Sequence, residues 1–137
     1  HKLVLFTVSS FLLDCNSFYW DYLKNNRENG YYHLFRLHPG HLYLKEELIS
    51  KLESIDYSNY NINEATSEEL YDLLGVIDVH VTQCSSVAEE ALHFGLKTII
   101  LEQNWKSYFE DYIINGDMFV PENESQLAEL LQTEFTT

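Results

Sequence analysis

The chain has 137 residues, of which 45% are hydrophobic and 15% aromatic, so it is long enough for one domain with a packed core and too short for a multidomain enzyme. Eight Lys and Arg residues stand against 22 Asp and Glu residues, a net charge of -14, which argues against a nucleic-acid partner because binding to phosphate backbones needs clustered positive charge. No run of roughly 18 apolar residues occurs, so we expect no membrane span in this chain.

The N-terminus starts at His1 and leads directly into an apolar run, without the charged start and cleavage site of a secretory signal. We therefore expect residues 1–137 to be one domain of a longer chain. Cys15 and Cys84 are far apart and lack CxxC spacing, which favours a reducing compartment over a disulfide framework or a zinc site. These features predict a cytoplasmic location, with contact to the inner face of the membrane only through a longer parent protein.

Strand and helix patterns alternate through the first half of the chain. The first apolar run is typical of a parallel strand buried on both faces, and amphipathic helices follow it and the next strand. Pro39 and Gly40 force the chain out of regular structure after the second strand. The predicted elements are strand 2–8, helix 18–29 stopped by Asn29-Gly30, strand 31–37, turn 38–41 and helix 45–55.

The second half continues this alternation. Thr66-Ser67 ahead of two glutamates is a capping pattern, and Gly95 is expected to stop a later helix. The predicted elements are a weak edge or near-edge strand 57–63, helix 66–74, strand 76–82, helix 86–95, strand 98–102, aromatic helix 105–112, short strand 117–120 and polar helix 124–134. We therefore predict an α/β fold, a Rossmann-like three-layer domain with a mainly parallel sheet and helices on both sides.

Three loops at carboxyl ends of the predicted strands are rich in hydroxyls and imidazoles: Ser9-Ser10, 38–41 and 82–86. Open α/β sheets bind ligands at this edge. The turn from Thr82 to Ser86 precedes a helix, whose free N–H groups and dipole suit a phosphate or pyrophosphate. For Ser85 and Ser86, ordinary helix capping is the alternative, because serine is a preferred N-cap residue.

Several ionisable side chains lie near these loops. His38 ends a strand, where its ring can donate to a phosphate or stack on a base, and His41 can do the same. A surface-turn role is the alternative for both histidines and is favoured for His41. Arg36 is expected to pair with an acidic neighbour. Glu90 can share a face with the phosphate turn and is expected to accept hydrogen bonds from ribose hydroxyls, while Glu89 is assigned to the helix dipole alone.

Standard catalytic and cofactor signatures are absent from the sequence. It contains no GxGxxG, GxxxxGK[ST] or GxSxG pattern, and its six histidines lack i, i+4 pairing, so no metal site is predicted. The aromatic residues near the C-terminus either cover a sheet edge, which is the favoured interpretation, or dock a partner. They are Trp105, Tyr108, Phe109 and Tyr112.

The strand ending in His38-Pro39, together with LYDLLGVIDVHVTQCSSVAEEALHFGLKTIILE at 70–102, resembles the C-terminal, nucleotide-sugar-binding domain of two-Rossmann-domain (GT-B) glycosyltransferases. It is most similar to capsule-polysaccharide and CDP-glycerol glycerophosphotransferase-like enzymes, with bacterial sialyl- and polysialyltransferases nearby. The resemblance covers about 35–102. Leu96-Lys97 departs from the Gly-Lys-Pro of many members, which implies a looser turn there.

This resemblance implies that an HP motif contacts the nucleotide and a Ser-Ser motif its phosphate, and that Glu90, Ala91 and Gly95 match a pattern common in donor domains. With Thr82 at the strand end, the nucleotide- or phosphate-binding residues expected are His38, Pro39, Thr82, Ser85, Ser86 and Glu90. The implied ligand is a nucleotide-sugar or CDP-polyol donor of CMP, CDP or UDP type, used as substrate without a separate cofactor.

The resemblance also implies glycosyl or glycerophosphate transfer in surface polysaccharide biosynthesis. In such enzymes an N-terminal acceptor domain usually supplies the catalytic base, and that domain is not in this chain, so the chain alone is not expected to be active. Two alternatives remain open. One is a UDP-sugar 2-epimerase-like domain, and the other is a non-catalytic accessory domain that uses the same fold to dock a partner.

Overall fold

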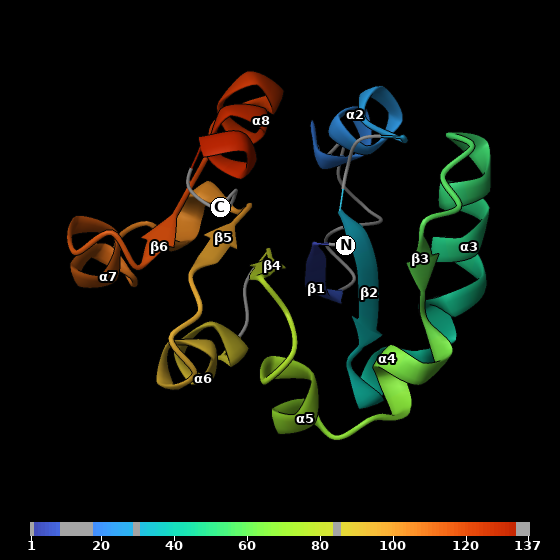
Figure 1. Ribbon diagram of the computed structural model, residues 1–137, viewed down its shortest axis with the longest axis horizontal. Coiled ribbons are helices and arrows are strands. Elements are labelled where there is room, and N and C mark those ends of the chain that lie inside the picture. The colour runs from blue at the N-terminus through green and yellow to red at the C-terminus, as the bar shows by residue number, and fades with distance from the viewer. Residues whose placement is uncertain (1, 9–17, 29–30, 84–85, 134–137) are drawn as a thin grey trace.

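Figure 1 shows the computed structural model, which describes residues 2–8, 18–28, 31–83 and 86–133. Six parallel strands form one sheet in the order β3-β2-β1-β4-β5-β6. This order places the first strand in the middle, as in doubly wound α/β folds, and confirms the predicted fold class. The strands are β1 (Leu3–Val8), β2 (Tyr32–Leu37), β3 (Tyr60–Asn61), β4 (Val79–Thr82), β5 (Thr98–Ile100) and β6 (Met118–Phe119).

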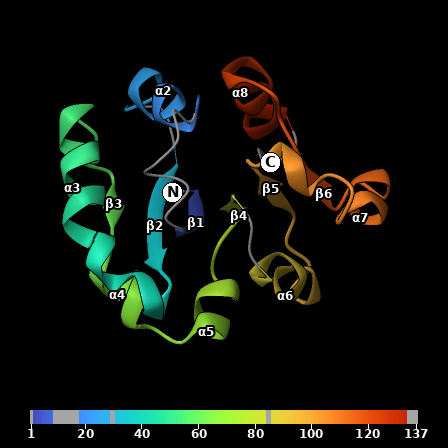
Figure 2. The ribbon, with the colours of Figure 1, turned by 180° about the vertical axis from the view of Figure 1, so that it is seen from behind.

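Helices cover both faces of this sheet, as the two opposite views make plain (Figure 1, Figure 2). One face is covered by α2 (Phe18–Asn25), α3 (Lys45–Ser54) and α8 (Glu124–Thr133), and the other by α5 (Leu70–Leu74), α6 (Val87–His93) and α7 (Glu110–Ile114). The remaining elements are α4 (Asn63–Ser67) and the 3-10 helices η1 (Pro39–Leu44) and η2 (Gln103–Trp105).

The central strand β1 feeds the core on both faces, which is why its sequence is a continuous apolar run. Val4 and Phe6 pack in the cluster with α2, α3 and α8, whereas Leu5 packs with α5 and α6. The ring of Phe6 meets that of Tyr19 edge-to-face at a centroid distance of 5.0 Å. Each such fully buried side chain contributes about 1.5–3 kcal/mol relative to an exposed one.

The predicted helix at 66–74 is wrong in its start and its continuity. Two short helices, α4 and α5, replace it, because Glu68 and Glu69 are both extended between them. The cap also differs from the prediction: Asn61 Oδ1 accepts the N–H groups of Glu64 and Ala65 at 3.0 and 3.1 Å, ahead of α4. Thr66, expected to cap, instead accepts the Leu37 N–H at 3.1 Å.

Other predicted elements are present but shorter. The first helix ends at Asn25, and the strand predicted at 57–63 is a two-residue edge strand, β3. The strand predicted at 76–82 begins only at Val79. The aromatic helix predicted at 105–112 is divided into η2 and α7. Gly95, with φ of +73°, ends α6 in the left-handed conformation that favours glycine, so its predicted role as a helix stop is confirmed.

Among the residues that the structure describes, Arg36 has backbone partners and not the acidic neighbour that we expected. Its guanidinium donates to the backbone carbonyls of Ala65 and Glu68, at 2.9 and 2.6 Å. These carbonyls lie at the end of α4, where unpaired backbone oxygens and the negative end of the helix dipole attract a cation. Arg36 therefore ties β2 to α4.

Candidate functional site

The strand order reverses direction at β1, which makes the carboxyl edge beside this strand the expected ligand crevice. From β1 the chain goes to β2 on one side, and β4 lies on its other side. Val8 pairs with Leu37, and Thr7 pairs with Thr82. The turns after β2 and β4 therefore flank the end of β1 and are separated by two strand spacings, about 10 Å. Ser9-Ser10, predicted at this edge, lies outside the described residues.

The turn after β2 holds His38 in a defined orientation. Its side chain is exposed, and its Nδ1 accepts the N–H of Gly40 at 3.0 Å, while its carbonyl accepts the N–H of His41 at 2.7 Å. Because Nδ1 is an acceptor, the neutral ring carries its proton on Nε2. The turn thus offers an N–H donor, and Pro39, exposed at the first position of η1, fixes the backbone behind it.

The turn after β4 carries the predicted phosphate residues, of which Ser85 lies outside the described part of the chain, as does Cys84. Ser86 is exposed and immediately precedes α6, and its side chain makes no capping hydrogen bond. Its carbonyl accepts the N–H groups of Glu89 and Glu90 at 3.1 and 3.4 Å. The alternative of side-chain capping is therefore not observed at Ser86, and its hydroxyl stays available for a ligand.

Thr82 and Glu90 are oriented toward neighbouring elements. Thr82 is fully buried, and its hydroxyl donates to the carbonyl of Thr7 at 3.3 Å. Glu90 is half-buried, and its carboxylate raises the pKa of Tyr71 at the start of α5. Glu89 likewise accepts a hydrogen bond from Tyr112 of α7 at 3.3 Å. The two glutamates thus connect α6 to the helices on either side, and contact of Thr82 and Glu90 with a nucleotide stays a prediction.

A buried polar chain that the sequence did not suggest lies on the α6 side of the sheet. His80 Nε2 lies 2.9 Å from the Thr7 hydroxyl and Nδ1 lies 3.1 Å from the Thr98 hydroxyl, so the imidazole links β1, β4 and β5. Burial lowers the pKa of His80 to about 3, and the ring is neutral at physiological pH. It fixes the strands whose carboxyl ends lie at the edge where a ligand is expected.

A second buried imidazole lies on the opposite face. His33 Nε2 lies 2.7 Å from the Tyr19 hydroxyl, and Nδ1 lies 2.9 Å from that of Tyr57. Burial lowers the pKa of His33 to about 4, an effect larger than the opposing one of its contact with the Tyr31 carbonyl. One signal in the sequence could have revealed both rings, since each histidine stands inside a strand whose neighbours are apolar.

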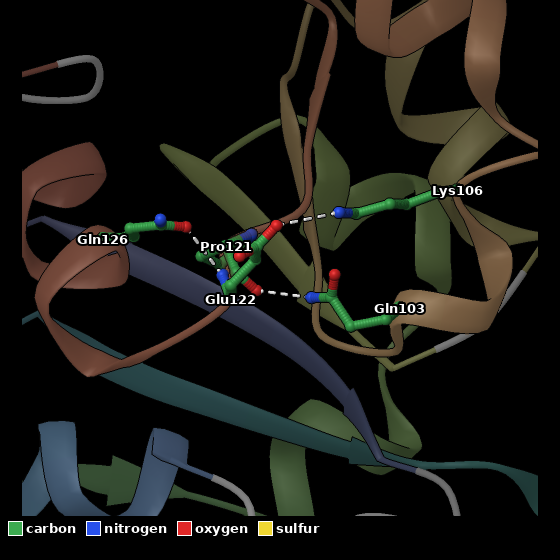
Figure 3. Close-up of polar contacts among 5 residues, drawn as sticks. All are labelled: Gln103, Lys106, Pro121, Glu122 and Gln126. Atoms are coloured by element: carbon green, nitrogen blue, oxygen red, sulfur yellow. Dashed lines mark hydrogen bonds and ion pairs between the residues drawn. The ribbon is translucent and has the colours of Figure 1, made fainter.

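The loops after β5 and β6 continue the same edge and are tied together (Figure 3). Gln103 Nε2 donates to the carbonyl of Pro121 at 2.7 Å, and Lys106 Nζ lies 3.2 Å from Glu122 Oε1. The N–H of Glu122 donates to Gln126 Oε1 at 2.8 Å. These contacts hold the outer end of the sheet in a fixed arrangement.

The aromatic residues near the C-terminus mostly cover the sheet, as the favoured interpretation predicted. Phe109 is buried in a cluster with Ala88, Ile100 and Met118, and Trp105 and Tyr112 pack partly against it. Tyr108 is exposed. In the part of the chain that the structure describes, no helix is long and apolar enough to cross a membrane, and no group of three or more potential metal ligands occurs.

Comparison with solved structures finds the same fold at low sequence identity. Similar chains are a putative UDP-N-acetylglucosamine 2-epimerase from Listeria monocytogenes (15% identity, TM-score 0.68, covering 98% of this chain and 37% of that one) and the C-terminal CMP-Kdo binding domain of WaaA from Acinetobacter baumannii (9%, 0.65, 96% and 79%). A third is the wall teichoic acid polymerase TagF (16%, 0.64, 96% and 34%).

These likenesses confirm a Rossmann-like domain of the kind that forms one half of a GT-B architecture. The chain spans 37% of the epimerase and 34% of the polymerase, so it corresponds to one part of each. At such identities the similarity shows the fold alone. No protein-family model matches the chain, and no curated protein matches it in sequence.

Proposed function

We propose that this domain binds the nucleotide part of an activated donor, a nucleotide sugar or a CDP-polyol, for glycosyl or glycerophosphate transfer in surface polysaccharide biosynthesis. The observation that carries the proposal is a pair of polar turns that flank β1 at the edge where the strand order reverses. One turn begins at His38 and the other ends at Ser86. Two similar structures support it, since one is a CMP-Kdo binding domain and another a wall teichoic acid polymerase.

Each turn has a separate role in this proposal. The Nε2–H of His38 donates to a phosphate oxygen, and the hydroxyl of Ser86 donates to another across the end of β1. Ser85 adds a second hydroxyl. These donors stabilise the negative charge that develops on the leaving nucleotide as its bond to the transferred group breaks. The net charge of -14 opposes an anion at long range, so binding depends on such local hydrogen bonds.

Titration of the 137-residue chain with CMP, CDP, UDP and GDP, by calorimetry and NMR, tests the proposal. We expect selective binding of one nucleotide, and His38→Ala or Ser86→Ala should each weaken it about tenfold, because each removes a hydrogen bond to a charged group. His93→Ala is the matched control, since this exposed histidine lies in the last turn of α6, away from the carboxyl edge. Absence of binding by all four nucleotides would contradict the proposal.

A longer protein containing this domain provides a stronger test. There His38→Ala combined with Ser86→Ala should abolish turnover, since one lost donor to a developing charge raises a barrier by about 2.7–4 kcal/mol. Transfer of the donor group at the unmodified rate would refute the assignment of both residues. The catalytic base is expected in another domain of that protein, so the domain described here binds the donor without transferring it.

A 2-epimerase-like role is the second candidate, favoured by the similarity to the putative UDP-N-acetylglucosamine 2-epimerase. The same edge would then hold the UDP of a UDP-sugar. Incubating the longer protein with a UDP-sugar distinguishes the two candidates: release of free epimerised sugar supports the epimerase, and a product joined to an acceptor supports the transferase. Binding of a protein partner without any nucleotide would instead support an accessory role.

A further inference from the structure

The turn after β2 exposes two consecutive large apolar side chains beside the candidate phosphate donor. Tyr43 is 72% exposed and Leu42 is 54% exposed, although both belong to a helical segment next to the core. Leu44, the next residue, is buried and holds η1 against the cluster around α3. Leu44 therefore anchors the turn to the core. Tyr43 is exposed although it belongs to this anchored helical segment.

The rings of this turn form a continuous series. The centroids of His38 and His41 are 5.4 Å apart at 48°, and those of His41 and Tyr43 are 6.0 Å apart at 85°. The edge-to-face contact supports Tyr43 from one side, while its large exposed area leaves surface open to solvent.

His41 adds an independent observation. Its Nδ1 is buried and has no hydrogen-bond partner among the residues that the structure describes. An unpaired buried polar atom costs free energy, so an apolar side chain would serve better if the position only filled space. The His41 ring therefore carries an uncompensated polar atom next to the exposed tyrosine.

The charge of the molecule restricts what this series of rings can bind. Residues 38–44 contain no Lys or Arg, and the whole chain is strongly acidic, so this turn itself supplies no permanent positive charge for an anion. A nucleobase is uncharged and presents a π-face, and stacking on an aromatic ring does not depend on the sign of the protein charge. A nucleoside phosphate combines this π-face with an oxyanion for the Nε2–H of His38.

We infer that Tyr43, supported by His41, is the stacking surface for the base of a nucleotide whose phosphate is bound at His38. This inference rests on the proposed function and adds to it the residue that recognises the base. Binding affinity is then divided between two contacts on one short turn: a hydrogen bond to the phosphate from His38 and stacking on the base by Tyr43.

The test uses the 137-residue chain with two probes, the tightest-binding nucleotide of the series above and ribose 5-phosphate, which lacks the base. Tyr43→Ala should raise the Kd for the nucleotide about fivefold or more and leave that for ribose 5-phosphate unchanged. Tyr43→Phe should retain the wild-type affinity, because it keeps the ring. The Tyr43 ring should also shift the base protons upfield in NMR spectra of the complex, and this shift should disappear in Tyr43→Ala.

Two control variants exclude a general effect of removing an exposed ring. Tyr108→Ala removes a tyrosine of similar exposure near α7 and should leave both affinities unchanged. Because Tyr43 is exposed, Tyr43→Ala should keep the wild-type thermal unfolding midpoint.

Each result has a definite meaning. Nucleotide binding that is equally tight in Tyr43→Ala would overturn the stacking role and leave the proposed function intact. Equal weakening of nucleotide and ribose 5-phosphate would also overturn it, since the base would then not be the group recognised. A wild-type chain that binds no nucleotide would overturn the proposed function and this inference together.

Discussion

Histidines occupy two regions of the molecule, and the regions give them different chemistry. His33 and His80 lie inside strands, are fully buried, and have hydroxyl partners on both ring nitrogens. His38 directly follows β2 and His41 lies three residues further on. His38 is exposed and uses only Nδ1 within the turn. A displacement of five residues along the chain, from His33 to His38, thus changes a structural imidazole into one that can meet a ligand.

The difference in chemistry arises from the exposure of each imidazole to solvent and from its hydrogen-bond partners. Inside the sheet the protonated form is disfavoured by desolvation, and the hydroxyls of threonine or tyrosine satisfy the neutral ring. At the carboxyl edge the backbone N–H of Gly40 binds Nδ1 and orients the ring, which leaves Nε2 for a ligand. Residue type alone therefore does not identify a site in this fold, whereas position relative to the strand end does.

The largest expected effect that would test this comparison is a loss of stability in acid. The pKa values of His33 and His80, about 4 and about 3, lie below the unfolded value of about 6.5. Between about pH 6.5 and these folded-state pKa values the unfolded state binds more protons than the folded state. The contribution of the two histidines to stability is therefore fully present above about pH 6.5 and falls as the pH drops toward 4 and 3. From pH 7 to pH 5 we expect a loss of about 2 kcal/mol per buried histidine, about 4 kcal/mol for the two together, measured by urea unfolding.

Protonation of carboxylates relieves repulsion in this acidic chain and offsets part of that loss. A variant isolates the histidine contribution: in His80→Gln the loss between pH 7 and pH 5 should be smaller than in the wild type by about 2 kcal/mol. His38→Gln is the matched control, because it replaces an exposed histidine that makes a single contact within its turn. An identical pH dependence in His80→Gln and wild type would show that His80 is not held neutral by burial.

A smaller change in unfolding free energy is expected when one histidine of each region is replaced by alanine at pH 7. His80→Ala leaves a cavity and removes the partners of the Thr7 and Thr98 hydroxyls, and should cost about 2–4 kcal/mol of unfolding free energy. His38→Ala removes a single exposed contact to Gly40 and should cost less than about 1 kcal/mol. Equal midpoints for the two variants in urea would remove the distinction between the regions.

The smallest effect should come from the exposed ion pair at the outer end of the sheet. The side chains of Lys106 and Glu122 are 45% and 61% exposed to solvent, which screens their attraction. We expect Lys106→Gln or Glu122→Gln to change stability by less than about 0.5 kcal/mol in thermal unfolding. A loss of more than about 1.5 kcal/mol from either variant would mean that this pair is as structurally important as the buried imidazoles.

The sheet could be predicted from the sequence because its signal is local. The apolar runs that become β1 and β4 are largely buried on both faces, β2 alternates between half-buried and buried residues, and Pro39-Gly40 indicates the turn after β2. The division into α4 and α5 could not be predicted in the same way. Asn61 caps α4 locally, three residues before Glu64, in place of the Thr66 that the capping pattern suggested. Thr66 instead binds the Leu37 N–H of β2, 29 residues away, and this tertiary contact is not visible in the sequence.

The candidate site was only partly predictable for the same reason. The orientation of His38 depends on Gly40, two residues away, and its exposed position after a strand follows from the pattern. The partners of His80, in contrast, are 73 and 18 residues away, and nothing in the spacing of its own strand reveals which hydroxyls will face it. The sequence predicts Thr82 as a ligand contact at a strand end, and only the pairing of β4 with β1 reveals that its hydroxyl donates to the Thr7 carbonyl.

The two-residue length of β3 and β6 has a consequence for how this molecule behaves among its own copies. Both strands stand at the borders of the sheet, the positions where unpaired backbone groups can recruit another chain into a growing aggregate. Edge strands of two residues expose few unpaired backbone groups, so they provide little template for such growth. A chain that is nearly half hydrophobic can therefore be expected to resist strand-by-strand aggregation while its central strands remain enclosed.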